Sequence, residues 1–220
     1  MRNFYGRKIS RRIEDNKIRE LKNFKFFLDN SKIQSKISLI QKSFNEFNLE
    51  IGFGMGCNLI NEAARSRGTC FLGCDPYLNG SIKLLNAINE TGLDNIFFSN
   101  LDFYNFAEYT KKIKFKNFFI LFPDPWPKNK HKKRRLINKK FVKKLITMSA
   151  VGSRIFILTD DKEYLSQINF FFGNVNSFKI LDNNNRFLLS QKYPTHYTKY
   201  YKRASLRNMR IYSLIFNYKN

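Results

Sequence analysis

Three acidic residues lie at or just after the ends of three short apolar segments, at the places where strands of a parallel sheet would end. These are Glu50, Asp75 and Asp102, and a glycine-rich turn, LEIGFGMG (residues 49–56), surrounds the first of them. Glycine lets a ligand approach the backbone, and an acid at a strand end can accept hydrogen bonds from ribose hydroxyls. Three such acids suit an adenosine cofactor that carries a cation, whereas a pyrophosphate would be repelled. S-adenosylmethionine, with its sulfonium and ammonium groups, has this character.

The individual signals at this first cluster are weak. Gly52, Gly54 and Gly56 follow the spacing G-x-G-x-G, not the dinucleotide pattern G-x-G-x-x-G, and a tight turn without a ligand would also explain them. Each acid alone is read more simply as a helix N-cap or a solvated loop residue. It is the set that favours a cofactor site, with the three glycines and the three acids as its binding residues.

A second cluster follows the most apolar segment of the chain. Asp124 lies between Pro123 and Pro125 in the string PDPWPK, and the prolines stiffen the turn that carries Asp124 and Trp126. A proline-rich turn with a packed tryptophan is the simpler alternative. The basic run 128–135 begins beside this turn and can hold phosphates while a base enters. Its His131 stands among cations that disfavour protonation, so we interpret it as an RNA contact or a bystander.

Short apolar segments alternate with amphipathic ones, and this alternation predicts an α/β fold. We expect strands at 47–51, 69–74, 96–99, 117–122 and 154–158, and helices at 31–45, 57–67, 79–90, 103–112, 134–149 and 162–172. Two late strands, at 177–181 and 210–217, flank a basic, aromatic insertion. The prediction is a doubly wound, seven-stranded, mostly parallel sheet with an antiparallel edge. Residues 1–30 are predicted to form a mobile basic arm and 31–220 a single domain.

Charge is unevenly distributed along the chain, whose formal net charge is +23. Residues 46–109 hold eight acids and three bases, whereas residues 128–144 hold ten bases and no acid. Basic stretches also occupy 1–25 and 192–210. A solvated face would explain one such block, but three of them around an acidic segment favour a nucleic-acid partner.

Other classes of protein are disfavoured by composition. No apolar run approaches eighteen residues and no apolar segment follows the basic start, so we expect neither a membrane span nor a secretory signal. Cys57, Cys70 and Cys74 include no C-x-x-C pair, which argues against disulfides and a zinc site. We therefore expect a cytoplasmic protein without a metal.

The strings at 49–56 and 123–135 together resemble the signatures of bacterial tRNA (guanine-N7-)-methyltransferases, over roughly residues 45–215. The resemblance implies a class I, Rossmann-like fold, S-adenosylmethionine as cofactor and tRNA as partner, with methyl transfer to N7 of a variable-loop guanine. Carried over by position, the cofactor contacts are Glu50, Asp75, Asp102 and Asp124, and Asp124 is also the catalytic residue. The substrate contacts are Lys128, Asp160, Thr198, Lys199, Tyr200 and Tyr201. The RNA contacts are Lys130, His131, Lys132, Lys133, Arg134 and Arg135.

The chain departs from the family pattern at two places. Tyr201 stands where the family motif T-x-x-E has its glutamate, and Pro127 replaces a usual histidine. Either Tyr201 bonds to or stacks on the guanine instead, or Asp160 or Asp161 supplies the missing carboxylate. The aromatic residues expected to stack on the base are Trp126, Tyr197, Tyr200 and Tyr201.

The chemistry that the resemblance implies needs no strong base, because guanine N7 carries a lone pair and no proton. This agrees with a chain that lacks a nucleophilic His or Cys constellation. A carboxylate near N1–H and N2–H would stabilise the cationic product. Two alternatives stay open: a methyltransferase of the same fold that acts on an exocyclic amine, and a non-catalytic RNA-binding protein. A dehydrogenase that binds a pyrophosphate cofactor is a more distant third. The sequence does not distinguish a monomer from a homodimer.

Overall fold

The computed structural model describes residues 4–10, 12–182 and 198–219. The chain divides into two compact units, Met1–Ile113 and Lys114–Asn220. This division falls within the predicted single domain 31–220 and does not coincide with the expected boundary at residue 30.

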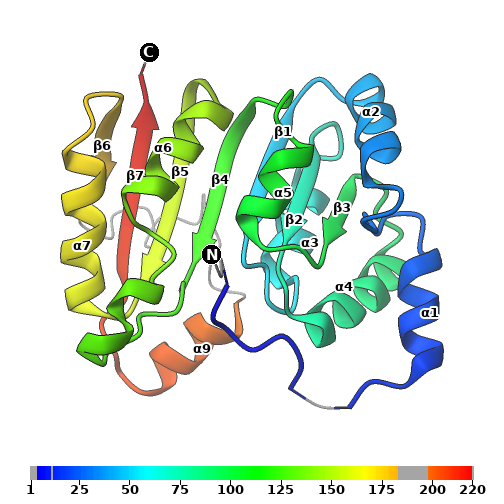
Figure 1. The fold of residues 1–220 in the computed structure, drawn as a ribbon, viewed down its shortest axis with the longest axis horizontal. Helices are drawn as coiled ribbons and strands as arrows, with labels where there is room; N and C mark the ends of the chain where they lie inside the picture. Colours follow the sequence, from blue (N-terminus) through cyan, green and yellow to red (C-terminus); the bar gives the residue numbers. More distant parts are fainter. Residues whose placement is uncertain (1–3, 11, 183–197, 220) are drawn as a thin grey trace. The chain divides into compact units, whose positions relative to one another are not determined.

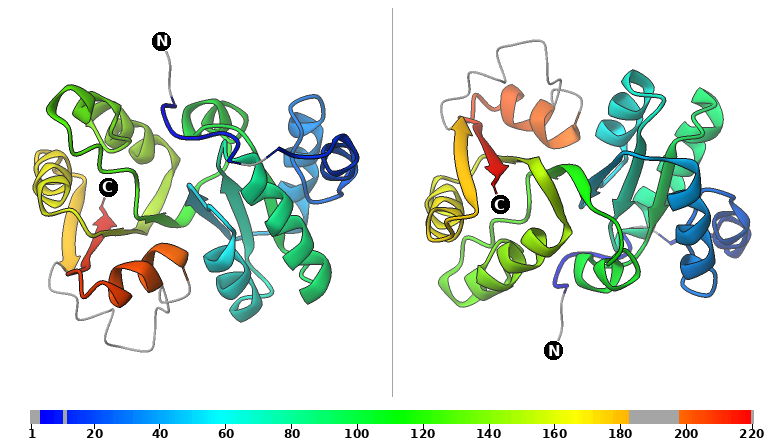
Figure 2. Two further views of the ribbon diagram at one scale, coloured as in Figure 1. Left: turned by 90° about the horizontal axis from the view of Figure 1, so that it is seen from below. Right: turned by 90° about the horizontal axis from the view of Figure 1, so that it is seen from above.

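The first unit contains three parallel strands in the order β3-β2-β1 (Figure 1). Its elements are α1 (Asp15–Asn23), α2 (Ile33–Ser43), β1 (Phe47–Ile51), α3 (Cys57–Arg65), β2 (Cys70–Cys74), α4 (Leu78–Thr91), β3 (Ile96–Ser99) and α5 (Phe103–Tyr109). Helices α2 and α5 lie on one face of the strands and α3 and α4 on the other (Figure 2). Because both faces are covered, every residue of β1 and β2 is buried, as the short apolar segments predicted.

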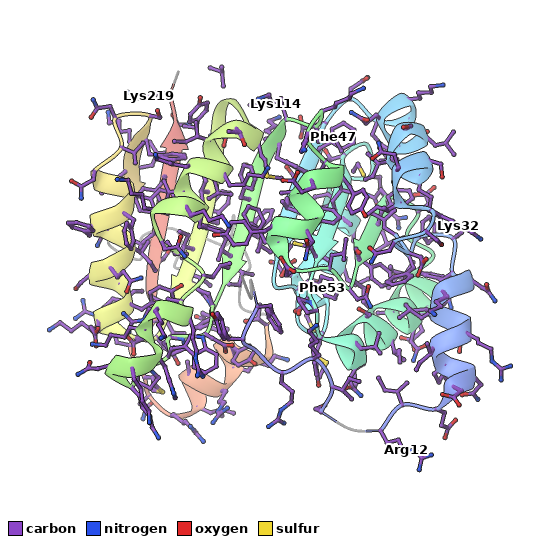
Figure 3. The ribbon with its side chains drawn as sticks, in the orientation of Figure 1. Arg12, Lys32, Phe47, Phe53, Lys114 and Lys219 are labelled. Carbon is purple, nitrogen blue, oxygen red and sulfur yellow. The ribbon has the colours of Figure 1, made fainter. Side chains whose placement is uncertain are left out.

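The register of these strands brings their carboxyl ends to one edge. Ile51 of β1 pairs with Cys74 of β2, and Cys74 pairs with Ser99 of β3. Figure 3 labels Phe47 at the start of β1 and Phe53 just beyond its end, in the turn that leads to α3. Glu50 near the end of β1 and Asp75 directly after β2 therefore share this edge, as the sequence predicted, and Asp102 comes three residues after β3.

The prediction of a mobile arm over 1–30 is wrong for residues 15–28. After α1, residues 26–28 pair with β3: the Leu28 N–H donates to the Phe98 carbonyl at 2.7 Å, and the Phe98 N–H donates to the Phe26 carbonyl at 3.1 Å. The Lys36 ammonium donates to the Phe27 carbonyl at 2.7 Å and binds the same segment to α2. Four apolar residues of this part of the chain are buried: Leu21, Phe26, Phe27 and Leu28. Their burial stabilises the packing of the segment on the rest of the first unit.

The second unit contains four strands in the order β4-β5-β7-β6. Its elements are β4 (Phe115–Leu121), the 3₁₀ helix η1 (Asn129–Arg134), α6 (Lys139–Met148), β5 (Ser149–Thr159), α7 (Lys162–Gly173), β6 (Phe178–Asp182), α9 (Lys199–Leu206) and β7 (Tyr212–Tyr218). Strands β4 and β5 are parallel, and β7 is antiparallel to both β5 and β6. The seven strands of the described residues thus confirm the predicted α/β class with its antiparallel edge.

One helix of this unit begins later than predicted. We expected a helix over 134–149, but α6 begins at Lys139 and the preceding residues form η1. The Asn138 side chain accepts a hydrogen bond from the Phe141 N–H at 3.1 Å and caps α6. An N-cap asparagine inside the basic run separates the two helices, since its backbone is extended there.

Helix α9 is the last helix of the described residues. Residues 183–197, including Tyr197 of the predicted stacking residues, lie outside the described part of the chain. Helices α6 and α7 cover one face of the strands of this unit, and α9 lies on the opposite face (Figure 2).

Among the described residues, every helix is too short or too polar to span a membrane. The same residues contain no group of side chains that could hold a metal ion.

Candidate active site

The glycine turn between β1 and α3 has a conformation that needs glycine. Gly52, Gly54 and Gly56 have φ angles of 81°, 55° and 78°, and Gly56 is the N-cap of α3. A Cβ atom built on Gly52 or Gly54 would meet no heavy atom of the protein within 4 Å, so this side of the turn is open. A Cβ on Gly80 of α4 would instead lie 1.9 Å from the Gly54 carbonyl oxygen. The turn is therefore packed against α4 on one side and open to a ligand on the other.

Asp75 holds this turn in place. One carboxylate oxygen accepts a hydrogen bond from the Gly54 N–H at 2.7 Å, and the other accepts from the Tyr77 N–H at 2.9 Å. The side chain is buried beneath the turn. The ribose contact of Asp75 stays a prediction. The structure adds a second duty, because the same carboxylate positions the glycine backbone.

Glu50 is the most strongly perturbed acid of the described residues. It is 2% exposed and accepts a hydrogen bond from the Asn58 side-chain amide at 3.1 Å. Desolvation raises the pKa of Glu50 to about 8, against an ordinary value of 4.5. The Asn58 Oδ1 atom is buried and has no hydrogen-bond partner within the described residues. A cationic group that donates hydrogen bonds would stabilise this site, because it would satisfy the Asn58 oxygen and offset the burial of the Glu50 carboxyl group.

Asp102 takes the role that we gave as the simpler alternative. It is the N-cap of α5, and its carboxylate accepts from the Tyr104 N–H at 3.0 Å and the Asn105 N–H at 3.2 Å. It lies three residues after β3, near the edge that also holds Glu50 and Asp75. The acidic edge, the open side of the glycine turn and the unsatisfied Asn58 oxygen together fit S-adenosylmethionine.

The second cluster lies in the other unit, on the turn that follows β4. Phe122 and Trp126 have φ angles of 54° and 44°, in a region that residues other than glycine rarely adopt. The Pro123–Pro125 segment thus lies between two strained residues, and strain of this kind concentrates at functional sites. Asp124 is exposed, yet the atoms around its carboxyl group desolvate it enough to raise its pKa. The turn presents one carboxylate on a stiff support.

Residues 128–134 follow this turn as an extended residue and the 3₁₀ helix η1. Lys128, Lys130 and Lys133 are exposed. The Arg134 guanidinium lies 5.0 Å from the centre of the Trp126 ring, and the His131 ring meets Trp126 edge-on at 5.8 Å. Desolvation, together with the neighbouring cations, lowers the pKa of His131. His131 is therefore neutral at pH 7, as its surroundings in the sequence predicted.

Two members of the predicted RNA-contact set are engaged within the protein. The Lys132 ammonium lies 2.6 Å from the Glu163 carboxylate of α7. Arg135 is 2% exposed, and its Nε–H donates to the Pro125 carbonyl at 2.6 Å. Arg135 was predicted to contact RNA, but in the structure its guanidinium is buried beneath the turn that follows β4. Position in a basic run does not distinguish a buried arginine from an exposed one.

The end of β5 carries two adjacent acids with different surroundings. Asp161 is the N-cap of α7 and accepts from the Tyr164 N–H at 2.6 Å. The half-buried Asp160 has no hydrogen bond to its carboxylate anywhere in the described ranges. Of the two candidates to replace the missing glutamate at position 201, Asp160 is the one whose carboxylate has no hydrogen bond to a described residue.

The T-x-x-Y segment forms the start of α9. The Thr198 hydroxyl accepts from the Tyr201 N–H at 3.0 Å, which makes Thr198 a helix cap, and Lys199 is the first residue of the helix. The Tyr200 ring packs on Phe122 with ring centres 6.2 Å apart and planes 24° apart. Tyr200 is about half exposed and Tyr201 is half-buried. An aromatic ring of α9 therefore lies against the residue that precedes the Asp124 turn.

Four residues of these sites were not predicted: Asn58, Phe122, Glu163 and Gln167, whose side-chain oxygen accepts from Arg135 Nη1 at 2.7 Å. Asn58 follows Glu50 by eight residues, a separation that points to no contact until the strand–turn–helix geometry is known. Phe122 looks like the last apolar residue of a strand, and only its position before Pro123 signals an unusual backbone. Glu163 and Gln167 resemble solvent-facing residues of an amphipathic helix.

Comparison with known proteins agrees with this arrangement. A family model described as "Putative methyltransferase" matches residues 45–214. The chain is 30% identical over 230 aligned positions to a tRNA (guanine-N(7)-)-methyltransferase of Buchnera aphidicola subsp. Baizongia pistaciae, which covers 100% of this chain and 93% of that protein. It is 38% identical over 144 residues to the protein of the same name from Wolbachia pipientis wMel, covering 66% of this chain and 64%, just under two thirds, of the relative.

Solved structures share the fold at low sequence identity. A 30S ribosomal A1408 methyltransferase from an uncultured bacterium aligns with a TM-score of 0.60 and 14% identity, over 84% of this chain and 93% of that chain. A Streptococcus mutans methyltransferase in complex with SAH aligns with a TM-score of 0.54 and 12% identity, over 84% of this chain and 97% of that chain. These likenesses confirm a class I methyltransferase fold. With the family match and the relatives above, the chain belongs to the tRNA (guanine-N7-)-methyltransferase family.

Proposed function

We propose that this protein transfers a methyl group from S-adenosylmethionine to N7 of a variable-loop guanine in tRNA. The observation that carries the proposal is the turn after β4. It holds the exposed Asp124 carboxylate between two strained residues, and the basic helix η1 follows directly. Family membership along most of the chain supports the same conclusion.

The first unit is proposed to bind the cofactor. Glu50 would release its proton when the ammonium group binds beside it. Asp75 would accept from the ribose, and the open side of the glycine turn would receive the adenosine. One carboxylate oxygen of Asp102 accepts hydrogen bonds from backbone N–H groups of α5. In our proposal Asp102 therefore contributes mainly negative charge at this edge. When bound, S-adenosylmethionine supplies an electrophilic methyl group.

The second unit is proposed to hold the guanine and its RNA backbone. Asp124 would accept from the N–H edge of the base and stabilise the positive charge that develops on the purine. Asp160, which has no hydrogen bond within the described structure, would take over the carboxylate role that Tyr201 cannot supply. No general base is required, because N7 carries no proton. Rate enhancement then depends on alignment and on the exclusion of water.

The aromatic and basic groups around the turn suit a base that is turned out of the tRNA. The exposed part of the Tyr200 ring offers a stacking surface beside Phe122. Lys128, Lys130 and Lys133 are exposed and would hold phosphates on either side of the target nucleotide. This assignment makes the second unit the main RNA-binding part of the chain.

The proposal is tested by incubating the purified protein with unmodified tRNA and methyl-labelled S-adenosylmethionine. The label is then located by borohydride reduction and aniline scission, which cleave only at N7-methylated guanine. Label and scission at one variable-loop guanine are expected. Label without scission would favour the exocyclic-amine alternative, and tRNA binding without label would favour a non-catalytic RNA-binding protein.

A further inference from the structure

Arg135 makes a set of contacts that an RNA-binding side chain would not need. Its Nε–H donates to the Pro125 carbonyl at 2.6 Å, and its Nη1 donates to the Gln167 side-chain oxygen at 2.7 Å and the Glu163 carboxylate at 3.2 Å. Its guanidinium also lies 4.9 Å from the centre of the Tyr164 ring. Arg135 thus joins the turn after β4 to three residues of α7. We infer that Arg135 is a positioning residue that holds the catalytic turn, not a contact for RNA; this inference rests on the proposed function.

The hydrogen bond to Pro125 acts on the strained part of the turn. The Pro125 carbonyl belongs to the peptide group that joins Pro125 to Trp126, and Trp126 has a φ of 44°. Such a conformation costs on the order of 1–3 kcal/mol and persists only when the surroundings hold it. An arginine that fixes the orientation of this peptide holds the residue directly after Asp124. Without it, rotation of the peptide would relieve the strain and move the carboxylate.

The support behind Arg135 includes a buried, hydrogen-bonded ring and a carboxylate nearer the surface. Tyr164 is fully buried, and its hydroxyl accepts from the Ile137 N–H at 2.9 Å. The ring on which the guanidinium packs is therefore held both by the surrounding core and by a hydrogen bond at its hydroxyl. Glu163 accepts from both Arg135 and Lys132. Lys132 is half-buried, whereas the side chain of Arg135 is almost fully buried. The carboxylate therefore lies between the basic surface of η1 and the guanidinium beneath the turn.

Three measurements on Arg135→Met, beside the matched variant Lys133→Met, test the inference. Both variants remove one charge from a long side chain, but Lys133 is exposed. For Arg135→Met we expect kcat at saturating tRNA and cofactor to fall about 100-fold, the loss expected for a misplacement of about 1 Å. The Kd for tRNA and its salt dependence should stay within twofold of wild type. For Lys133→Met we expect weaker tRNA binding and a salt slope reduced by up to about 0.9.

The third measurement needs no activity, because Trp126 is the single tryptophan of the chain and reports on the turn itself. Acrylamide quenching of its fluorescence should increase about twofold in Arg135→Met and stay unchanged in Lys133→Met. If the wild type proves inactive, the proposed function fails, and the quenching contrast still decides the role of Arg135. Quenching and kcat that match wild type in Arg135→Met would overturn the inference. So would a loss of tRNA affinity and salt slope equal to that of Lys133→Met.

Two further variants separate the hydrogen bonds from folding and from charge. Should Arg135→Met not fold, Gln167→Leu keeps the arginine and removes its acceptor, together with the hydrogen bond that Gln167 Nε2 donates to the Ile137 carbonyl at 2.9 Å. We expect about a fivefold loss of kcat with a partial rise in quenching. Wild-type values in Gln167→Leu would contradict the inference. Arg135→Lys keeps the charge but cannot span Pro125 and α7 together, so it should restore less than a tenth of kcat. Full rescue by lysine would show that charge alone suffices, and would overturn the positioning role.

Discussion

The two compact units of this chain use their acidic residues in different ways. The first unit has 12 acids and 17 bases, for a net charge of +5, and the second has 5 acids and 23 bases, for +18. In the first, the acids near the sheet edge are bonded within the protein: Glu50 to Asn58, Asp75 and Asp102 to backbone N–H groups. In the second, Asp124 is exposed and Asp160 has no hydrogen bond in the described residues.

Under the proposed function, this difference lets one protein present carboxylates to two different ligands. Acids that are buried and bonded internally make a fixed site for a small cation-bearing molecule, since their orientation is set before the ligand arrives. Acids left available amid an excess of cations can select the polar edge of a base, while the surrounding lysines attract its phosphates. The predictions below alter one unit at a time.

The largest expected effect comes from Asp124. Asp124→Ala should lower the single-turnover rate of tRNA methylation at least about 100-fold, because no other carboxylate stands on the strained turn. The thermal midpoint and the tRNA affinity should stay unchanged, since the side chain is exposed. Asp124→Asn is the matched control, because it keeps the shape and removes the charge, and we expect most of the loss to persist. A rate near wild type in either variant would remove Asp124 from catalysis.

In the first unit, the pKa of Glu50 predicts how stability depends on pH. Its folded value of about 8 exceeds the ordinary value of 4.5, so between these limits the folded state binds more protons than the unfolded state. Without cofactor, the free energy of unfolding should therefore fall as pH rises from 4.5 to 8, by up to about 1.4 kcal/mol per pH unit.

Urea unfolding at pH 5, 6.5 and 8 measures this dependence, and Glu50→Gln provides the control. The glutamine cannot ionise, so this variant should lose most of the decline. An equally steep decline in Glu50→Gln would show that another group titrates, and would contradict the burial of a protonated Glu50.

The adjacent acids at the end of β5 should separate stability from catalysis. Asp161→Ala removes the cap of α7 and should cost about 1 kcal/mol of stability in chemical denaturation, with methylation retained. Asp160→Asn should leave stability unchanged and lower the methylation rate about tenfold. If Asp161→Ala lost the activity and Asp160→Asn kept it, the carboxylate that we assign to the guanine would be the wrong one.

The smallest effect is expected from single lysines on η1. Lys130→Met should reduce the slope of log affinity for tRNA against log salt by up to about 0.9, with a loss of affinity of a few fold. Lys42→Met, an exposed lysine of the first unit outside the basic blocks, is the control and should leave the slope unchanged. Equal reductions of the salt slope in both variants would mean that lysines of the first unit contribute to tRNA binding as much as those of the second, and would contradict the assignment.

Much of this fold could be predicted because the strands are short, apolar and bounded by turns. The segments 47–51 and 96–99 were expected with the bounds that the structure shows. The packing of Phe27 on Phe98 could not be predicted, because residues 24–28 have neither helical nor alternating periodicity and are ordered by distant contacts.

The candidate sites divide in the same way. The glycine turn and Asp124 could be predicted, since both depend on local backbone chemistry. The burial of Arg135 and the exposure of Lys133 could not, because two neighbouring cations look alike until α7 packs against one of them. Sequence identifies a basic run, whereas tertiary contacts decide which of its members remain free for a ligand.

The atom that receives the methyl group is the most direct test of the account. A tRNA carrying 7-deazaguanosine at the mapped variable-loop position has a C–H group where guanine has N7, and it keeps both exocyclic groups. We predict that this tRNA binds with unchanged affinity and accepts no methyl group, while the unmodified tRNA is methylated. Methylation of the 7-deaza substrate at the wild-type rate would contradict N7 transfer and would assign the chain to a different methyltransferase chemistry.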